Sequence, residues 1–497
     1  MMGRSQRREP KLFYTNLNLE SRVPAEHPLR RVSELVDFQF VRERVRGLYG
    51  RRGQPSVDPV VLIKLMFLLY FENVRSERAL MDQLPLRLDW LWFCGYDLDD
   101  TVPHHSVISK ARRRWGVSVF ESLFEQVLAQ CVASGLVEGR VVHMDASLIA
   151  ANASRDRLRP AMRLAAQTLY QSLEAPPDDD VERSDERQAP STAWDDDDDG
   201  PRGASDGVPP ELPTAPISPV DPDARLKTIG SKTVLGYKDH RVVDDRSGVI
   251  TASITTDAAT AESHMLTELL DQHERHVGRR VSTVVADKGY GTAANYQSLR
   301  RRGVTPCIPH VRVAPPQSRF PVSAFAYDVV QDLYICPAGR TLEPYTVEVA
   351  ERRRRYRAAR GVCEACALRE QCTTNVTGRI VSRHLLQDDI TWADECCSKM
   401  RRRLLMRRRK IRAEGSFADA SNNHGYKRAR WRRRWRVQIQ NLLIATIQNL
   451  RKLMKTGPVK PLAARLVESA TAISLQLSKW LRQRISVVQS PVPSSII

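Results

Sequence analysis

Acidic residues at three places in this sequence are the candidates for metal-dependent chemistry. Two of them, Asp145 in VVHMDAS and Asp287 in VVADKGYG, stand where an apolar stretch ends, which predicts a carboxylate at the end of a buried strand. Two carboxylates brought together repel each other unless a divalent cation lies between them. Mg²⁺ (or Mn²⁺) prefers such oxygen ligands. Two ions about 3.5–4 Å apart activate the attacking oxygen and stabilise the leaving oxygen of a phosphodiester.

The third carboxylate is predicted to come from the most basic part of the chain. Between Lys399 and Arg436 there are 16 Lys and Arg but two acidic residues, a net charge of +14 over 38 positions. Glu414 is one of those two, and an isolated acid among arginines favours a metal ligand. For each aspartate alone a turn or a helix cap is the simpler interpretation, whereas the three acids together favour a catalytic site.

The elements that must position these acids mix helices and strands, which predicts an α/β core with a mixed sheet flanked by helices. Helices are expected at 55–75, 76–84, 107–115, 120–134 and 264–278, and the segment 388–454 is expected to be helical. Strands are expected at 140–149, 233–244, 248–255, 281–286 and 305–309.

These elements suggest a division of the chain into regions. Residues 1–135 form a predicted N-terminal helical domain, a candidate for DNA binding through its basic helix. The catalytic core is divided among 136–173, 225–320 and 388–456, the last part carrying Glu414, and residues 321–387 form a Cys-rich insertion. Residues 457–497 are expected to form a C-terminal helix and tail. The segment 174–224 has 16 acidic residues and ten Pro, which predicts a disordered linker.

The charge balance indicates a polyanionic partner. The 497 residues hold 77 Lys and Arg against 58 Asp and Glu, a formal net charge of +19. Its concentration in one segment, interleaved with Trp431 and Trp435, favours nucleic acid over the plain alternative of a solvated helical face. The predicted helix at 107–115 is also basic and could enter a DNA major groove. The candidate DNA contacts are Lys110, Arg112, Arg113, Arg114, Lys238, His240, Arg407, Lys410, Lys427, Arg428, Arg430 and Trp431.

Two of these candidates leave an alternative open. Lys238 and His240 in GYKDH could face phosphate or the metal site, or they could belong to an exposed hairpin. Trp431 could stack on an unpaired base of a bound nucleic acid, or it could pack on the neighbouring helix.

Clustered cysteines predict a second kind of metal site. Cys336 is followed by Cys363, Cys366 and Cys372, the last three spaced C-x₂-C-x₅-C. Four thiols suit a tetrahedral structural Zn²⁺, and reduced cysteines packing a small core are the alternative.

The sequence resembles a DDE transposase of bacterial insertion sequences, in the broad IS5/IS1182-like group. The N-terminal module is carried by GQPSVDPVVLIKLMFLLYFENVRSERAL, and the first two catalytic blocks by HMDASLIAANAS and VVADKGYGTAANY. The third block is AEGSFADASNNHGYKRARWR, followed by QIQNLLIATIQNLRKL. The resemblance covers nearly the whole chain. It implies an RNase H-like catalytic core with Asp145, Asp287 and Glu414 as catalytic carboxylates.

The resemblance also implies an activity and its partners. The metals would activate water to nick double-stranded DNA at the element's terminal inverted repeats, and the freed 3′-OH would attack target DNA. A homodimer on DNA is expected, because two ends must be held together. A catalytically decayed or repurposed DNA-binding protein is the alternative, and a nuclease that never joins strands would use the same carboxylates.

Around the glutamate this sequence departs from the family pattern. The family often has Tyr seven before, Arg four before and Lys seven after the glutamate. Here those positions hold Arg407, Lys410 and Ser421, and Lys427 could substitute for the missing lysine.

Composition excludes several other classes. Apolar residues make up 42% and charged residues 27%, which rules out collagen-like and wholly disordered chains. The longest apolar run, Val60–Phe71, contains Lys64 and falls short of the ~20 residues that span a bilayer. The basic N-terminus lacks an apolar signal segment, so a cytoplasmic, nucleoid-associated protein with no membrane partner is expected.

Overall fold

The computed structural model describes residues 2–3, 18–50, 52, 54–160, 216–310 and 319–456. Most of the predicted linker at 174–224, and the helix and tail expected at 457–497, lie outside the described residues. Within the described ranges, no helix is both long and apolar enough to cross a membrane.

The N-terminal part is helical, as predicted. Its main capping signals act as the sequence indicates: the Asp58 carboxylate accepts from the Val60 N–H, Pro59 is the first helical residue, and the Ser76 hydroxyl accepts from the Ala79 N–H. The helices are α1 (Leu19–Arg22), α2 (Pro28–Leu35), α3 (Phe40–Val45), α4 (Pro59–Phe71), α5 (Glu77–Gln83), α6 (Leu88–Cys94), α7 (Ser106–Trp115) and α8 (Ser118–Ala133).

The central sheet is mixed and follows the predicted strands. Its strands are β1 (Val141–Ala150), β2 (Arg225–Ile229), β3 (Lys232–Asp244), β4 (Ile250–Asp257), β5 (Thr283–Val285) and β6 (Thr305–Cys307). The order is β2-β3-β1-β5-β6, and β4 pairs with β3. β3 is antiparallel to β1, β2 and β4, whereas β1, β5 and β6 run parallel. The sequence did not predict β2.

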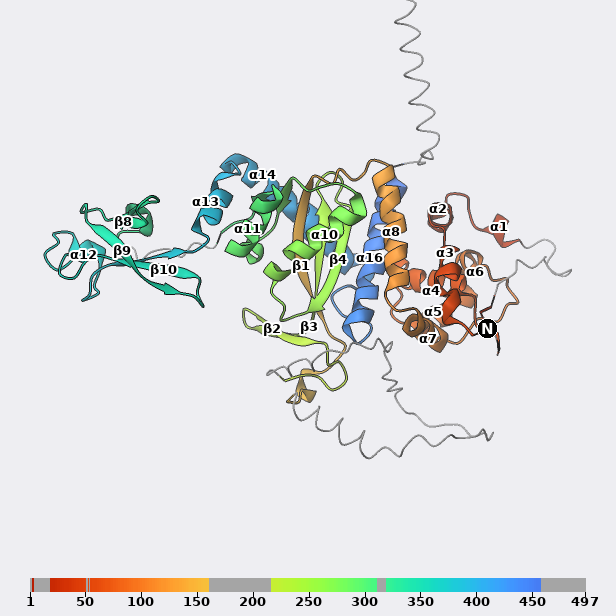
Figure 1. Cartoon of the computed structure of the whole chain (residues 1–497). Helices are drawn as coiled ribbons and strands as arrows, with labels where there is room; N and C mark the ends of the chain where they lie inside the picture. The colour runs from red at the N-terminus through yellow and green to blue at the C-terminus, as the bar shows by residue number, and fades with distance from the viewer. Residues whose placement is uncertain are drawn as a thin grey trace, which may run out of the picture.

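The other helices lie beside this sheet or follow it in the chain (Figure 1). They are α10 (Leu266–Val277), α11 (Ala293–Arg302), α13 (Gln387–Glu395), α14 (Lys399–Arg409), α15 (Gly415–His424) and α16 (Arg434–Lys455). Between α14 and α15 the backbone forms a π-helical turn, η8 (Lys410–Glu414), so the basic segment is not one continuous α-helix.

Residues 319–384 form a second, antiparallel sheet with its own small core. Its strands are β7 (Ala326–Asp328), β8 (Leu333–Ile335), β9 (Thr341–Glu348), β10 (Arg353–Arg357) and β11 (Ile380–His384), in the order β11-β10-β9-β8-β7, together with the short helix α12 (Arg369–Cys372). Three tyrosines, Tyr327, Tyr334 and Tyr356, pack against one another there. Figure 1 shows this lobe set apart from the central sheet.

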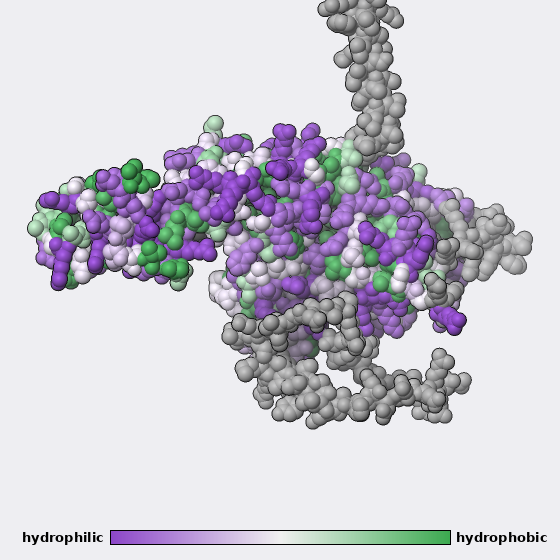
Figure 2. All heavy atoms as spheres, viewed as in Figure 1, coloured by the Kyte–Doolittle hydropathy of each residue, from purple (hydrophilic) through white to green (hydrophobic). Residues whose placement is uncertain are grey.

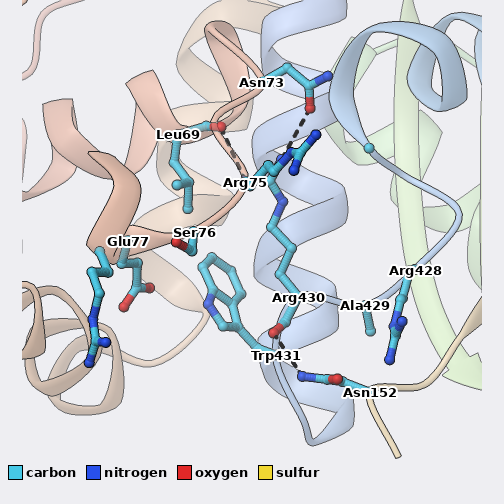
Figure 3. Close-up of a pocket in the computed structure, with 12 residues that line it drawn as sticks. Leu69, Asn73, Arg75, Ser76, Glu77, Asn152, Arg428, Ala429, Arg430 and Trp431 are labelled. Atoms are coloured by element: carbon cyan, nitrogen blue, oxygen red, sulfur yellow. Dashed lines mark hydrogen bonds between the residues drawn. The ribbon is translucent and has the colours of Figure 1, made fainter. Parts of the chain in front are cut away.

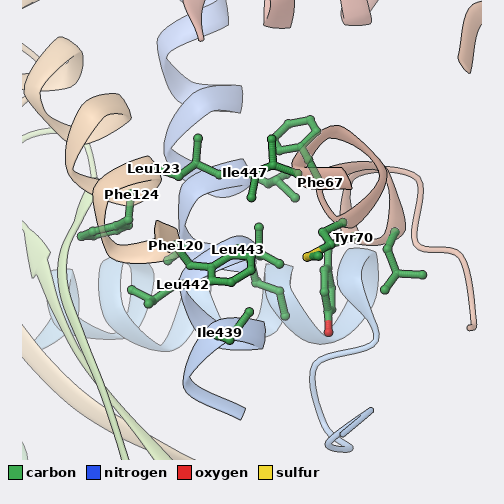
Figure 4. Packing of buried hydrophobic residues seen from close by; sticks show 14 of the residues in the cluster. Phe67, Tyr70, Phe120, Leu123, Phe124, Ile439, Leu442, Leu443 and Ile447 are labelled. Atoms are coloured by element: carbon green, nitrogen blue, oxygen red, sulfur yellow. The ribbon is translucent and has the colours of Figure 1, made fainter. Parts of the chain in front are cut away.

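One apolar core joins the N-terminal helices to the rest of the molecule. It contains buried residues of α4, α8 and α16, and Figure 4 shows them interleaved: Phe67, Tyr70, Phe120, Leu123, Phe124, Ile439, Leu442, Leu443 and Ile447. Burying one such side chain stabilises the fold by about 1.5–3 kcal/mol. The helical residues before position 135 therefore share a core with the C-terminal helix α16.

Helix α16 also satisfies the outer edge of β4 with amide side chains. Asn449 accepts from the Ile250 N–H at 2.8 Å and donates to the Ile250 C=O at 2.7 Å. Gln438 accepts from the Thr255 N–H at 2.6 Å and donates to the Ser253 C=O at 2.8 Å. These amides replace the backbone partner that an edge strand lacks.

The predicted linker is wrong at its C-terminal end. Ser218, Asp221 and Ala224 are fully buried. Asp221 accepts hydrogen bonds from the Tyr237 hydroxyl and from the Arg433 N–H, which tie this segment to β3 and to the start of α16. The physical reason is that Asp221 finds polar partners on the core, which the composition of 174–224 as a whole does not reveal.

Candidate active site

Asp145 lies in the middle of β1, not at its end as predicted. β1 continues to Ala150 because its pairing with β3 continues, and Asp145 stands opposite Arg241 of β3. Its pairing with β5, however, stops at His143. Asp145 is therefore just beyond the point where β5 leaves β1, which opens the sheet on that side.

Asp287 follows β5 by two residues, as the sequence predicts. Its Oδ1 accepts from the Gly289 N–H at 2.9 Å and so caps the short 3₁₀ turn η6 (Lys288–Tyr290). The capping role, considered as the simple alternative for a lone aspartate, is thus real. No described residue donates a hydrogen bond to the second oxygen, Oδ2.

Glu414 ends the π-helical turn η8 and is linked to Asp145 through one arginine. Arg409 Nη2 donates to Glu414 Oε1 at 2.8 Å, and its Nη1 lies 3.2 Å from Asp145 Oδ2. The Arg409 side chain is 9% exposed and that of Glu414 is 46% exposed. A single buried guanidinium therefore bridges carboxylates that are 269 positions apart in the chain.

The charges of Asp287 and Glu414 both act on Asp145. Burial raises the pKa of Asp145 to about 6, Arg409 opposes that rise, and the charges of Asp287 and Glu414 add to it. Each neighbouring carboxylate makes ionisation of Asp145 harder, which is the repulsion that a cation would relieve. Within the described ranges, no three His, Cys, Asp or Glu side chains are close enough together to hold a metal ion as they stand.

Sequence reasoning missed Arg409, and the π-helical turn explains why. The family pattern places an arginine four residues before the glutamate, where this chain has Lys410, and Lys410 is exposed. A π-helical turn closes a hydrogen bond from residue i+5 to residue i, here from the Gly415 N–H to the Lys410 C=O. The wider turn brings the residue five positions before Glu414, Arg409, onto its face.

The predicted DNA contacts on α7 differ in their exposure to solvent. Lys110 and Arg114 are exposed, and Arg114 lies over the Tyr49 ring. Arg113 is half-buried. Arg112 is buried, forms an ion pair with Glu77, and packs 3.7 Å from the centre of the Trp431 ring. Arg112 thus joins α5, α7 and the 425–433 loop and does not face solvent.

Lys238 and His240 are also buried, so the exposed-hairpin alternative is wrong. His240 accepts or donates one hydrogen bond with the Thr256 hydroxyl at 2.9 Å, and burial lowers its pKa to about 3. Lys238 donates to the Thr260 C=O at 2.7 Å and lies 3.6 Å from Glu262. Neither side chain is available to a DNA phosphate.

Lys427 lies close to the acids along β1. Its Nζ donates to the Ser147 hydroxyl at 3.0 Å, and Ser147 is two residues beyond Asp145 and so on the same face of the strand. Arg407 and Arg428 are exposed. Figure 2 shows hydrophilic side chains gathered over the region of α13 and α14.

A basic cavity of about 680 Å³ lies between α4, α5 and the loop before α16 (Figure 3). It is lined by Leu69, Asn73, Arg75, Ser76, Glu77, Arg78, Asn152, Gly425, Arg428, Ala429, Arg430 and Trp431. Arg430 holds the wall in place by donating to the backbone oxygens of Leu69 and Val74 and to the Asn73 side chain. Trp431 packs edge-on against Tyr70 and under Arg112, so its packing role is established.

The four predicted zinc ligands converge in the second sheet. Cys336, Cys363, Cys366 and Cys372 line the same small cavity. Burial raises the pKa of the Cys372 thiol, and the other three cysteines add to the rise. The Arg340 N–H donates to Cys336 Sγ at 3.4 Å. All nine cysteines are free, and Cys94, Cys131, Cys307 and Cys397 are buried.

Two family models match separate parts of the chain. Residues 17–114 match the family described as "Transposase domain (DUF772)", and residues 335–454 match the family described as "Transposase DDE domain". The second match includes Glu414 and the helices on either side of it. No curated protein matches the chain.

A solved structure is also similar in part. It is a cryo-EM structure of the piggyBac transposase synaptic complex with hairpin DNA, 12% identical, with a TM-score of 0.24 over 99% of this chain and 90% of that one. A likeness with so low an identity and TM-score supports no conclusion about this chain. The two domain matches, in contrast, confirm the resemblance seen in the sequence motifs, and they support a DDE transposase of an insertion sequence.

Proposed function

We propose that this chain cuts DNA at the ends of its own element and joins the freed 3′-OH to target DNA, with Asp145, Asp287 and Glu414 as the catalytic carboxylates. The observation that carries the proposal is the Arg409 bridge between Asp145 and Glu414. β1 and η8 place Asp145 and Glu414 on either side of one buried guanidinium, that of Arg409, beside the turn that carries Asp287. Such convergence is expected of acids that share a catalytic site and not of acids that each cap a separate turn or helix.

The strand arrangement supports an RNase H-like core for this activity. In such a core three antiparallel strands are followed by two parallel ones, and the acids come from the first strand, the fourth strand and a later helix. The order β4-β3-β1-β5-β6 matches that arrangement, with Asp145 on β1, Asp287 after β5 and Glu414 before α15.

The donor chemistry suits Mg²⁺ or Mn²⁺, since carboxylate oxygens are what these ions prefer. Asp145, Asp287 and Glu414 would hold the ions, which when bound lower the pKa of water and neutralise charge at the phosphate. Arg409 lies between two of these acids, so we propose that it swings away when cations and DNA enter. Lys427, next to Ser147, would hold a phosphate near the cut.

The DNA would approach over the basic loop that precedes α16. Arg428 and the cavity that it lines are close to the end of β1, where Ala150 and Arg428 form a bridge. Five residues separate Ala150 from Asp145, or about 16 Å of strand. We propose that one DNA strand crosses this distance, and that two copies of the chain hold two ends. In the second sheet, Cys336, Cys363, Cys366 and Cys372 would hold a structural Zn²⁺.

The test uses the inverted repeats that flank the reading frame in its natural DNA as substrate. We expect Mg²⁺-dependent nicking and a strand-transfer product from the wild-type chain. Asp145→Asn, Asp287→Asn and Glu414→Gln should each abolish both reactions while end binding persists. The exposed Asp156→Asn variant is the matched control.

Each other outcome has a different meaning. An active Glu414→Gln variant would overturn the assignment of the three acids. DNA binding without any cleavage would favour a decayed or repurposed DNA-binding protein. Nicks without joined products would favour a nuclease.

A further inference from the structure

A fourth carboxylate lies beside the candidate active site. Glu262 begins the 3₁₀ turn η5 (Glu262–Met265), which follows β4. A methyl group placed on Gly289 would lie 2.5 Å from Glu262 Oε2 and 3.1 Å from Asp287 Oδ1. Two carboxylates from different elements therefore face one point above the Gly289 backbone, and a side chain at position 289 would fill that point.

A buried hydroxyl faces the same acids. Tyr290 is fully buried, and in the described part of the chain its hydroxyl has no hydrogen-bond partner. The charges that act on this hydroxyl are those of Glu262, Asp145, Asp287 and Arg409. A buried O–H without a partner destabilises the fold, so its position within reach of these charges calls for an explanation.

Lys238 contacts Glu262 loosely, and the charge of Lys227 also acts on this carboxylate. Lys238 Nζ lies 3.6 Å from Glu262 Oε1, whereas it donates a shorter hydrogen bond, 2.7 Å, to the Thr260 C=O. The Glu262 side chain remains 26% exposed. Lys238 thus balances the charge at one oxygen of Glu262 and leaves Oε2 directed at the Gly289 side.

We propose that Glu262 is a metal-ligating residue that, together with Asp287, holds one divalent cation of the Mg²⁺ or Mn²⁺ class. The inference rests on the proposed function, because Asp287 belongs to the catalytic set, and it adds a ligand that the three-acid pattern does not contain. The Tyr290 hydroxyl, which has no partner among the described residues, would donate to an oxygen of that set or to a water on the ion. A Cβ on residue 289 would push the Glu262 carboxylate away from Asp287, because it would lie 2.5 Å from Glu262 Oε2.

The experiment is a Mn²⁺ titration of the full chain without DNA, with free Mn²⁺ followed by electron paramagnetic resonance. We expect Glu262→Gln to weaken Mn²⁺ binding about tenfold or more. Glu268→Gln, an exposed acid six residues further along, is the matched control and should bind as the wild type does. Gly289→Ala should weaken binding as well, although it removes no carboxylate.

A second variant tests whether Glu262 is a metal ligand or only the ion-pair partner of Lys238. Lys238→Met frees Glu262 of its neighbouring cation, so Mn²⁺ binding should tighten if Glu262 is a ligand. Unchanged binding in both Lys238→Met and Glu262→Gln, with melting curves that show folded protein, would overturn the inference. If the wild-type chain itself binds no Mn²⁺, the metal-dependent function falls with it, so the two failures are distinguishable.

Discussion

Arg241 and Asp239 form a fully buried ion pair in β3, with Nε and Oδ2 2.7 Å apart. Both side chains have exposed fractions of zero. The Arg241 guanidinium lies over the rings of Phe417 and Tyr426, and its Nη1 donates to Gln448 at 3.0 Å. The pair thus joins the strand opposite Asp145 to α15, which begins directly after Glu414, and to α16. It fixes one side of the candidate site relative to the other.

Removal of one partner of this pair should be far more damaging than removal of both. Arg241→Met leaves the Asp239 charge buried, which we expect to lower the free energy of unfolding by about 3–5 kcal/mol. The double variant Asp239→Leu/Arg241→Met should recover part of that loss. Chemical denaturation of the three proteins measures the difference. A double variant no more stable than Arg241→Met would contradict this account.

His240 should make the protein sensitive to acid. Burial is the main cause of its lowered pKa of about 3, Lys238 adds to it, and Asp257 opposes it. In the unfolded chain His240 takes up a proton near pH 6.5, so its contribution to stability is present above that pH and is lost as the pH falls toward 3. At pH 5 the loss is about 2 kcal/mol. His240→Gln should lose less stability between pH 7 and 5 than the wild type, whereas the exposed His264→Gln should behave as the wild type.

Arg409 should compete with divalent cations. Arg409→Ala removes the charge that now neutralises Asp145 and Glu414, so the apo protein should be less stable. Mn²⁺ should then bind about tenfold more tightly, a change of about 1.4 kcal/mol, well within the attraction of unit charges about 4 Å apart. Calorimetric titration gives the affinities. Arg408→Ala, whose guanidinium pairs with Asp245 instead, is the control. Weaker Mn²⁺ binding in Arg409→Ala would count against competition.

Two arginines should affect DNA binding in different ways. Arg428 is exposed near the end of β1, so Arg428→Ala should lower the slope of log affinity against log salt by about 1. Arg112 is buried against Glu77 and Trp431, so Arg112→Ala should leave that slope unchanged but lower the melting temperature. Fluorescence anisotropy on a DNA duplex at several salt concentrations gives the slopes. Equal slopes for both variants would contradict this prediction.

The cysteine cluster should release zinc when one ligand is lost. Cys366→Ser should lower the bound zinc from about one ion per chain and destabilise the β7–β11 sheet, because a structural site contributes directly to folding. Cys94→Ser, a buried cysteine far from the cluster in sequence, is the control. Elemental analysis and thermal melting measure both effects. Zinc-free wild-type protein would favour the packing alternative for these thiols.

Much of the fold could be predicted because its signals are local. The start of α4 at Asp58 and Pro59 follows from capping chemistry, and β1, β3 and β4 follow from apolar patterning. β5 was expected to be longer than Thr283–Val285, since β-branched residues outside a ladder look the same as those inside it. β2 was missed because its surroundings resemble the linker.

The candidate site could be predicted in part, for a different reason. Residue type and order selected Asp287 and Glu414 as candidates. Asp145 was expected at a strand end, although the strand expected at 140–149 continues past it, as β1 does. The position of Arg409 beside Glu414 depends on a π-helical turn, which no local residue preference predicts. Glu262 and Arg241 matter through contacts across the sheet, which are visible only once the strands are paired.

The amide contacts between α16 and β4 have a consequence for synthesis of the chain. β4 is complete at Asp257, but Gln438 and Asn449 are translated some 180 residues later, so a nascent chain holds an unpaired strand edge for that whole interval. Unpaired edges recruit other strands. We therefore expect products that terminate before α16 to aggregate or be degraded, so that a frameshift anywhere upstream of position 434 silences the protein rather than leaving a binding-competent fragment.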